Sequence, residues 1–134
     1  PKASSQLSAF MSLTRLATFV TVDRRGRPHA VPVFFTYGDG KIYVQTNRKS
    51  VKVSNLRWNS NVAVSVHSDE EAVVIRGIGR IVEDRSEFVN RTKEHVEKYN
   101  PRLDQEGRDG MGIPLFDEAV RCVIEVIPKK VLFW

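Results

Sequence analysis

The segment from Gly26 to Asn59 constrains the fold more than any other part of the sequence. Apolar, β-branched and aromatic residues dominate Pro28–Tyr37 and return in Lys41–Thr46, and Gly-Asp-Gly at positions 38–40 separates the two runs. Two such runs around a short glycine-containing turn predict a β-hairpin. Pro32 has no backbone N–H, so the first strand is expected to be irregular or to lie at a sheet edge.

Short strands joined by turns fill most of the remaining chain. Helices are predicted over Ser5–Thr14, over Ser50–Trp58, and from the capping residue Asp84 to Asn100. Further strands are predicted over Leu16–Val22, Val62–His67, Ala72–Glu83 and Arg121–Leu132. Because no β–α–β alternation appears, the chain is expected to be mainly β: one domain over residues 1–134, a six-stranded antiparallel barrel that closes on itself, with two to three flanking helices. The spacing of Gly77 and Gly79 predicts close approach of another backbone or a strong bend.

The composition fits one small intracellular domain. The chain has 134 residues, 41% of them hydrophobic, and no apolar run approaches the 18 or so residues of a membrane span. The N-terminus lacks the build of a signal peptide, so a cytoplasmic protein without a membrane partner is expected. The single Cys122 excludes an internal disulfide and is expected to be half-buried and inert in its strand.

Charge favours an anionic small ligand over nucleic acid. The formal net charge is +5, and many of the cationic residues lie in the first half of the chain. Neither aromatic residues interleaved with the cations nor a helix that carries most of them is evident, which disfavours nucleic-acid binding. His29, His67 and His95 fall in three separate elements without metal-ligand spacing, so no metal site is expected and a surface or satisfied structural role is predicted for each.

The strongest candidate site follows the second strand of the hairpin. Hydroxyl and cationic side chains are concentrated there within seven positions: Thr46, Arg48, Lys49, Ser50 and Lys52. Ser50 is expected to cap the helix that follows. A helix N-terminus offers unpaired N–H groups and the positive end of a dipole, and cationic side chains add charge-assisted hydrogen bonds. This arrangement predicts a phosphate site.

The same motifs carry a family resemblance. They are GRPH-x-VPV-FF, then x-Y-V-x-T, then S-x-K-x-x-N-L-x-x-N, followed by VAVSV and VVIRGIGRI. In this order they resemble the flavin-binding split barrels of the pyridoxamine 5′-phosphate oxidase-like family. The resemblance runs from about Leu16 to Val82, with a weaker echo in Arg121–Leu132.

The resemblance implies an FMN-binding oxidoreductase that holds its cofactor at the interface of a homodimer. The stretch Ala30, Val31, Pro32 and Val33 would lie beside the flavin ring. The other implied cofactor-binding residues are Gln45, Thr46, Arg48, Lys49, Ser50, Val51 and Lys52, of which Thr46, Ser50 and Lys52 would surround the phosphate. The family often has an arginine at position 51, and we expect Arg48 or Lys49 to substitute for it.

Several readings stay open at this stage. A reductase that uses the deazaflavin coenzyme F420 is one alternative, because its acidic tail would also suit the cations. A non-catalytic flavin carrier or sensor, or a haem-binding relative, is another. Pyridoxamine phosphate oxidase activity itself is disfavoured, because the ending VLFW lacks the Arg-x-His that such enzymes use on their substrate. No catalytic constellation is evident, but a flavin would carry the hydride chemistry itself. The substrate is not predicted, and the loop Pro101–Phe116 is expected to border the site.

Overall fold

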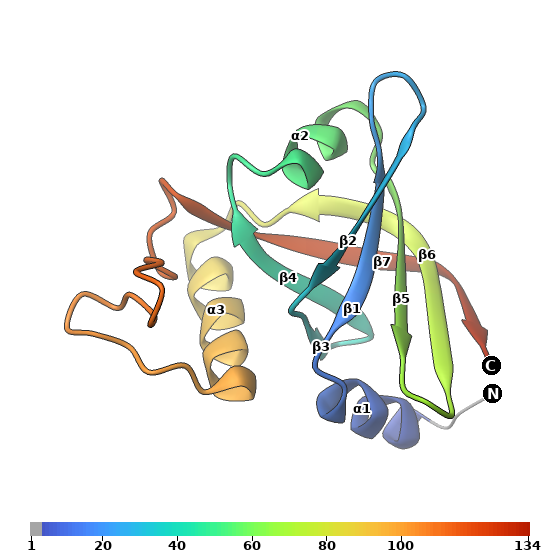
Figure 1. The fold of residues 1–134 in the computed structure, drawn as a ribbon, viewed down its shortest axis with the longest axis horizontal. Helices are drawn as coiled ribbons and strands as arrows, with labels where there is room; N and C mark the ends of the chain where they lie inside the picture. Colours follow the sequence, from blue (N-terminus) through green and yellow to red (C-terminus); the bar gives the residue numbers. More distant parts are fainter. Residues whose placement is uncertain (1–3) are drawn as a thin grey trace.

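The computed structural model describes residues 4–134, which form one curled antiparallel sheet and three helices (Figure 1). The strands are β1 (Ala17–Val22), β2 (Pro28–Val33), β3 (Thr36–Gly38), β4 (Lys41–Asn47), β5 (Asn61–His67), β6 (Ala72–Ile81) and β7 (Arg121–Phe133). The helices are α1 (Ser4–Leu13), α2 (Val51–Trp58) and α3 (Arg85–Tyr99). None of the helices within residues 4–134 is both long and apolar enough to cross a bilayer.

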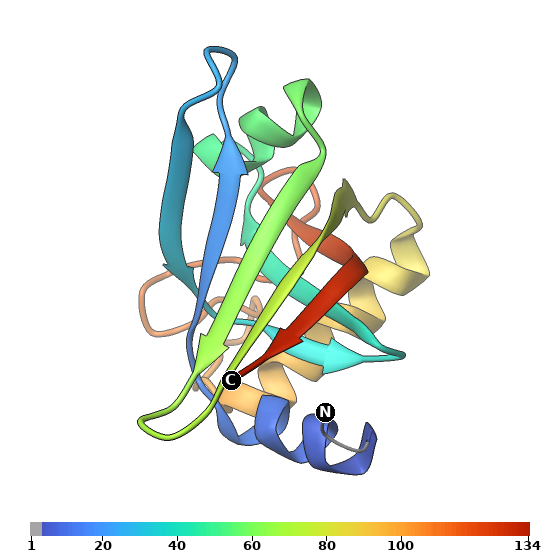
Figure 2. The same cartoon turned by 90° about the vertical axis from the view of Figure 1, so that its right-hand side faces the viewer.

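The sheet has the strand order β2-β1-β5-β6-β7-β4-β3, and each neighbouring pair is antiparallel. It curls into a half-barrel, as Figures 1 and 2 show from two sides. The two edge strands, β2 and β3, do not pair with each other within the described part of the chain. The predicted split-barrel fold is confirmed, but the expectation that the barrel closes on itself is wrong.

The predicted count of six strands is also wrong, because Pro28–Tyr37 forms two strands instead of one. The break lies at Phe34 and Phe35. The N–H of Phe35 donates to the Tyr99 hydroxyl at 2.9 Å, and its carbonyl oxygen lies 3.0 Å from the same hydroxyl. At this point the backbone therefore bonds to a side chain of α3 in place of a neighbouring strand. The predicted strand is interrupted here and continues as two separate strands, β2 and β3.

The core lies inside the curl and follows the alternation of the strands. In β5, Val62, Val64 and Val66 are buried, whereas the residues between them are partly exposed. Met11 of α1 and Val53 of α2 join the same cluster from opposite ends of the barrel (Figure 1). The helices therefore close the two openings that the curled sheet leaves.

A β-bulge interrupts the pairing between β6 and β7. Arg76 is in register with Lys130 and Gly77 with Pro128, so one residue of β7 is left over. A Cβ added to Gly77 would overlap the carbonyl oxygen of Ile127 and lie 2.9 Å from its carbonyl carbon. The close backbone approach predicted at Gly77 is confirmed, and the proline without an N–H falls where the ladder is already irregular.

A buried carboxylate ties three strands together outside the core. Glu125 of β7 is 1% exposed; it accepts a hydrogen bond from the Tyr43 hydroxyl at 3.1 Å and from Arg80 Nε at 2.5 Å. Burial raises the pKa of Tyr43 to about 12. Because cationic and hydroxyl partners surround this carboxylate, we assign it a structural role.

Candidate anion-binding site

The turn between β4 and α2 is anchored to the start of β7. The N–H of Arg48 donates to the carbonyl oxygen of Val120 at 2.8 Å, and the N–H of Ser50 donates to that of Asn47 at 3.0 Å. Asn47 is in register with Arg121. The backbone therefore brings the first turn of α2 close to the first residue of the last strand.

Ser50 precedes α2 in extended conformation, yet its side chain makes no cap hydrogen bond. The prediction that its hydroxyl caps the helix is wrong. Its Oγ is buried and has no hydrogen-bond partner. Buried polar atoms are nearly always hydrogen-bonded, so an unpartnered hydroxyl at a helix N-terminus is suited to a ligand oxygen.

Lys52, in the first turn of α2, is half-buried. Burial lowers the pKa of its ammonium group, and the positive charge of Arg121 lowers it further. Within residues 4–134, Lys52 forms no ion pair with a carboxylate. An anion beside the ammonium group would offset the free-energy cost of its burial and of its repulsion by Arg121.

Arg121, which the sequence analysis did not assign to the site, is also half-buried. Its Nε and Nη2 donate to Gln45 Oε1 at 3.0 and 2.7 Å, and Gln45 Nε2 donates to the carbonyl oxygen of Leu115 at 2.6 Å. Burial lowers the pKa of Arg121, whereas Cys122 and Asp109 raise it. The loop that contains Leu115 thus borders this cluster, as expected.

The other residues predicted to bind the cofactor in this segment differ in their exposure. Thr46 is buried, Lys49 is exposed, and the side chain of Val51 is largely exposed. The Arg48 guanidinium donates from Nε to the carbonyl oxygen of Glu118 at 2.8 Å. Of the predicted set, Gln45 therefore contacts Arg121 directly, whereas Ser50 and Lys52 lie on the turn that the backbone anchors near Arg121.

The predicted flavin-lining stretch is an edge strand. β2 has β1 as its neighbour in the sheet and no strand on its other side among residues 4–134. Ala30 and Pro32 are exposed, Val31 is partly buried, and Val33 is buried. The edge position predicted from Pro32 is confirmed, and main-chain groups on that side are available to a ligand.

Cys122 is fully buried next to this region, not half-buried as expected. Burial raises the pKa of its thiol, against an opposing influence from Arg48, Arg121, Lys52 and Arg57. The thiol thus lies in a basic environment, and its burial keeps it in the unreactive protonated form.

An aromatic cluster follows β2 directly. The rings of Phe34 and Tyr99 lie 4.7 Å apart, and those of His95 and Tyr99 lie 5.0 Å apart. The expectation of a surface or satisfied His95 is wrong, because the residue is 8% exposed and its Nδ1 is buried without a partner. Burial lowers the pKa of His95 to about 4, so the imidazole is neutral at pH 7.

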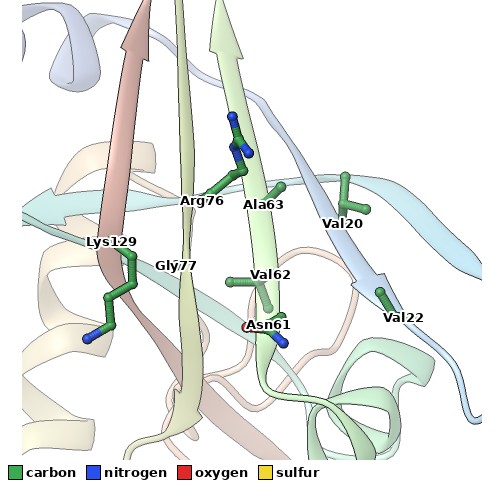
Figure 3. A pocket seen from close by; sticks show the side chains of 8 residues that line it. All are labelled: Val20, Val22, Asn61, Val62, Ala63, Arg76, Gly77 and Lys129. Atoms are coloured by element: carbon green, nitrogen blue, oxygen red, sulfur yellow. The ribbon is translucent and has the colours of Figure 1, made fainter. Parts of the chain in front are cut away.

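A hollow of about 370 Å³ lies on the outer face of the sheet. Figure 3 shows its floor of apolar side chains from β1 and β5, including Val20, Val22 and Ala63, with Arg76 and Lys129 beside Gly77. No group of three His, Cys, Asp or Glu side chains within residues 4–134 is arranged to hold a metal ion.

A curled antiparallel half-barrel with a basic turn at the start of a short helix defines a split-barrel protein with a candidate anion site. Residues 3–134 match the family model described as pyridoxamine 5′-phosphate oxidase. The chain therefore belongs to the pyridoxamine 5′-phosphate oxidase family, and the resemblance read from the motifs is confirmed. No match to the chain was found among curated proteins.

Solved structures share the fold at low sequence identity. The conserved hypothetical protein Rv2991 from Mycobacterium tuberculosis has a TM-score of 0.81 and 20% identity, over 100% of this chain and 85% of that one. The heme storage protein HutZ from Vibrio cholerae has a TM-score of 0.76 and 15% identity, over 100% and 94%. An F420 reductase has a TM-score of 0.73 and 18% identity, over 98% of both chains.

Proposed function

We propose that this chain binds FMN and acts as a flavin-dependent oxidoreductase on a small substrate. The observation that carries the proposal is the buried, unpartnered Ser50 hydroxyl at the start of α2, where the partly desolvated Lys52 follows two residues later. The phosphate of FMN carries nearly two negative charges at neutral pH and offers three acceptor oxygens. The residues present fit that group.

The residues of β2 would orient the ring of the flavin. The strand has a free edge, so its backbone N–H and C=O groups on that side can bond to the polar rim of the ring. Pro32 offers a carbonyl oxygen only, which makes the pattern of donors along this edge uneven. Bound FMN would supply the hydride chemistry, and the chain would supply binding, orientation and exclusion of water.

The outer face of the sheet supports a homodimer with the cofactor at its interface. Val20, Val22, Ala63 and Val74 are partly exposed there, and the opposite face of the same strands already forms the core. Solvent-facing sheet surfaces normally carry polar residues, so this apolar face is suited to a second copy of the chain.

Absorbance of the natively purified protein tests the proposed cofactor. FMN predicts the two near-ultraviolet and blue bands of an oxidised flavin, and release of the ligand by acid identifies it by mass. A deazaflavin spectrum or a Soret band in place of these bands would overturn FMN in favour of coenzyme F420 or haem. Bleaching by a pyridine-nucleotide reductant and recovery with an electron acceptor would then separate an oxidoreductase from a carrier.

A further inference from the structure

We propose that Arg121, held in place by Gln45, is the second cation that binds the phosphate of the ligand. The inference rests on the proposed function of the turn at Ser50 and Lys52. The family often has an arginine at position 51, where this chain has none. We assign the role of that arginine to Arg121 in β7, and not to the neighbouring residues Arg48 and Lys49.

The backbone places Arg121 at this turn. Asn47, which lies three residues before Ser50, is the register partner of Arg121. A hydrogen bond of 2.8 Å from the N–H of Arg48 to the carbonyl oxygen of Val120 fixes the turn against the start of β7. Lys52 is close enough to Arg121 for the charge of the arginine to act on it. The turn thus brings cationic side chains of α2 and β7 near each other, and the buried Ser50 hydroxyl lies at the start of α2.

Arg121 differs from the arginines that carboxylates tie into the fold. Arg80 and Arg91 both form ion pairs with carboxylates, namely Glu125 for the first and Asp39 and Glu94 for the second. Arg121 instead bonds to an uncharged amide oxygen, and within residues 4–134 it makes no ion pair. A half-buried guanidinium next to a second cation retains donors for an anion.

The neighbouring candidates are less suited. Lys49 is exposed, so a contact through its ammonium group would have to order a flexible, fully solvated side chain. The guanidinium of Arg48 is held by a single hydrogen bond within residues 4–134, from Nε to the carbonyl oxygen of Glu118. Arg121, in contrast, is oriented before any ligand arrives, because Gln45 is itself held by Leu115 and is 7% exposed.

Equilibrium titration with FMN and riboflavin tests the inference, because the two ligands differ only in the phosphate. In Arg121→Gln we expect FMN affinity to fall about tenfold to a hundredfold and riboflavin affinity to stay within about threefold of wild type. Arg121→Lys should retain part of the FMN affinity, since it keeps the charge and loses the forked contact with Gln45. Gln45→Leu should weaken FMN by a smaller factor, because the guanidinium stays and is no longer oriented.

Arg57→Gln is the matched control, because Arg57 lies on the last turn of α2 and is exposed. It should bind both flavins as wild type does. If Arg121→Gln fails to fold, judged by near-ultraviolet circular dichroism, Arg121→Lys and Gln45→Leu carry the test. Unchanged FMN affinity in the folded Arg121 variants, with Lys52→Ala still weakened, would overturn the role of Arg121 and leave the proposed function intact. Equal affinity of wild type for FMN and riboflavin would overturn both.

Discussion

At the scale of single residues, Lys52 is the most direct test of the phosphate site. Lys52→Ala removes the ammonium group of a half-buried lysine, two residues after the buried, unpartnered hydroxyl of Ser50. A hydrogen bond to a charged group contributes on the order of 1.5–3 kcal/mol, so FMN should bind roughly tenfold to a hundredfold more weakly. Riboflavin should lose far less. Fluorescence titration of both flavins measures this, and an equal loss for the two ligands would place the phosphate elsewhere.

His95 makes stability depend on pH. Burial lowers its pKa from the 6.5 of an ordinary histidine to about 4 in the folded chain. Between these values the unfolded chain binds more protons, so the stabilisation is complete above about pH 6.5 and is lost as the pH falls towards 4. The difference is up to about 3 kcal/mol. Arg121 and Lys98 favour the neutral ring, and Asp109 opposes them.

Urea unfolding at pH 7 and at pH 4.5 measures this effect. His95→Phe keeps a ring against Phe34 and Tyr99, and it should lose less stability than wild type when the pH is lowered. His67→Gln, at an exposed position of β5, is the control and should respond to pH as wild type does. Identical pH responses of wild type and His95→Phe would show that the buried imidazole is not the group that titrates.

At the scale of elements, the bulge between β6 and β7 makes Gly77 and Gly79 differ in their surroundings, although the two glycines look alike in the sequence. A Cβ at Gly77 meets the backbone of Ile127, which cannot move without breaking the ladder. A Cβ at Gly79 comes within 2.8 Å of the end of the Leu56 side chain, which can rotate away. Gly77→Ala should therefore cost about 1–3 kcal/mol of unfolding free energy, and Gly79→Ala less. Thermal unfolding of both variants checks the order, and equal losses would contradict it.

Helices and strands were predicted well where the local sequence pattern determines their position. Alternation in β5 and turn residues at positions 38–40 are local signals, and both elements appear where expected. The division of Pro28–Tyr37 was not predictable, because it depends on Tyr99, which is 64 residues away from Phe35. Register, in the same way, depends on pairing between distant strands.

The long loop after α3 has more local order than its composition indicated. Asp104 Oδ1 accepts from the N–H groups of Glu106 and Arg108, and Asp109 Oδ1 accepts from those of Met111 and Ile113. The hairpin turn at Asp23 has the same pattern, and each turn places its fourth residue, a glycine, at positive φ: Gly26, Gly107 and Gly112. The spacing Asp-x-x-Gly was a readable signal for these turns.

At the scale of the whole molecule, the proposed dimer depends on the outer face of the sheet. Wild type should sediment at twice the 15.3 kDa of one chain at micromolar concentration. Val20→Glu should shift it to the mass of one chain, because the carboxylate would be buried between the two copies. Asn90→Glu, at an exposed position of α3, is the control and should remain dimeric. Wild type that sediments as a single chain with its cofactor bound would contradict the proposed dimer.

Of the candidate anion site, the sequence predicted only the part that one contiguous segment of the chain builds. Residues 46–52 carry a compact signal because one short segment holds several ligand groups. Arg121 carries no such signal, since it is an ordinary residue of a strand until the fold brings it next to Gln45. Sequence spacing therefore identifies the half of the site that the local chain builds, and the topology of the sheet provides the rest.

The contact between Gln45 and Arg121 also determines when the candidate site can form as the chain is synthesised. The two residues are 76 positions apart, and β7, which begins at Arg121, leaves the ribosome after the strands with which it pairs. A nascent chain that has exposed α2 has the local half of the phosphate turn but neither the guanidinium nor the strand that anchors Arg48. We therefore expect the proposed cofactor to bind late, after β7 has docked, and to stabilise the chain only once its long-range contacts have formed.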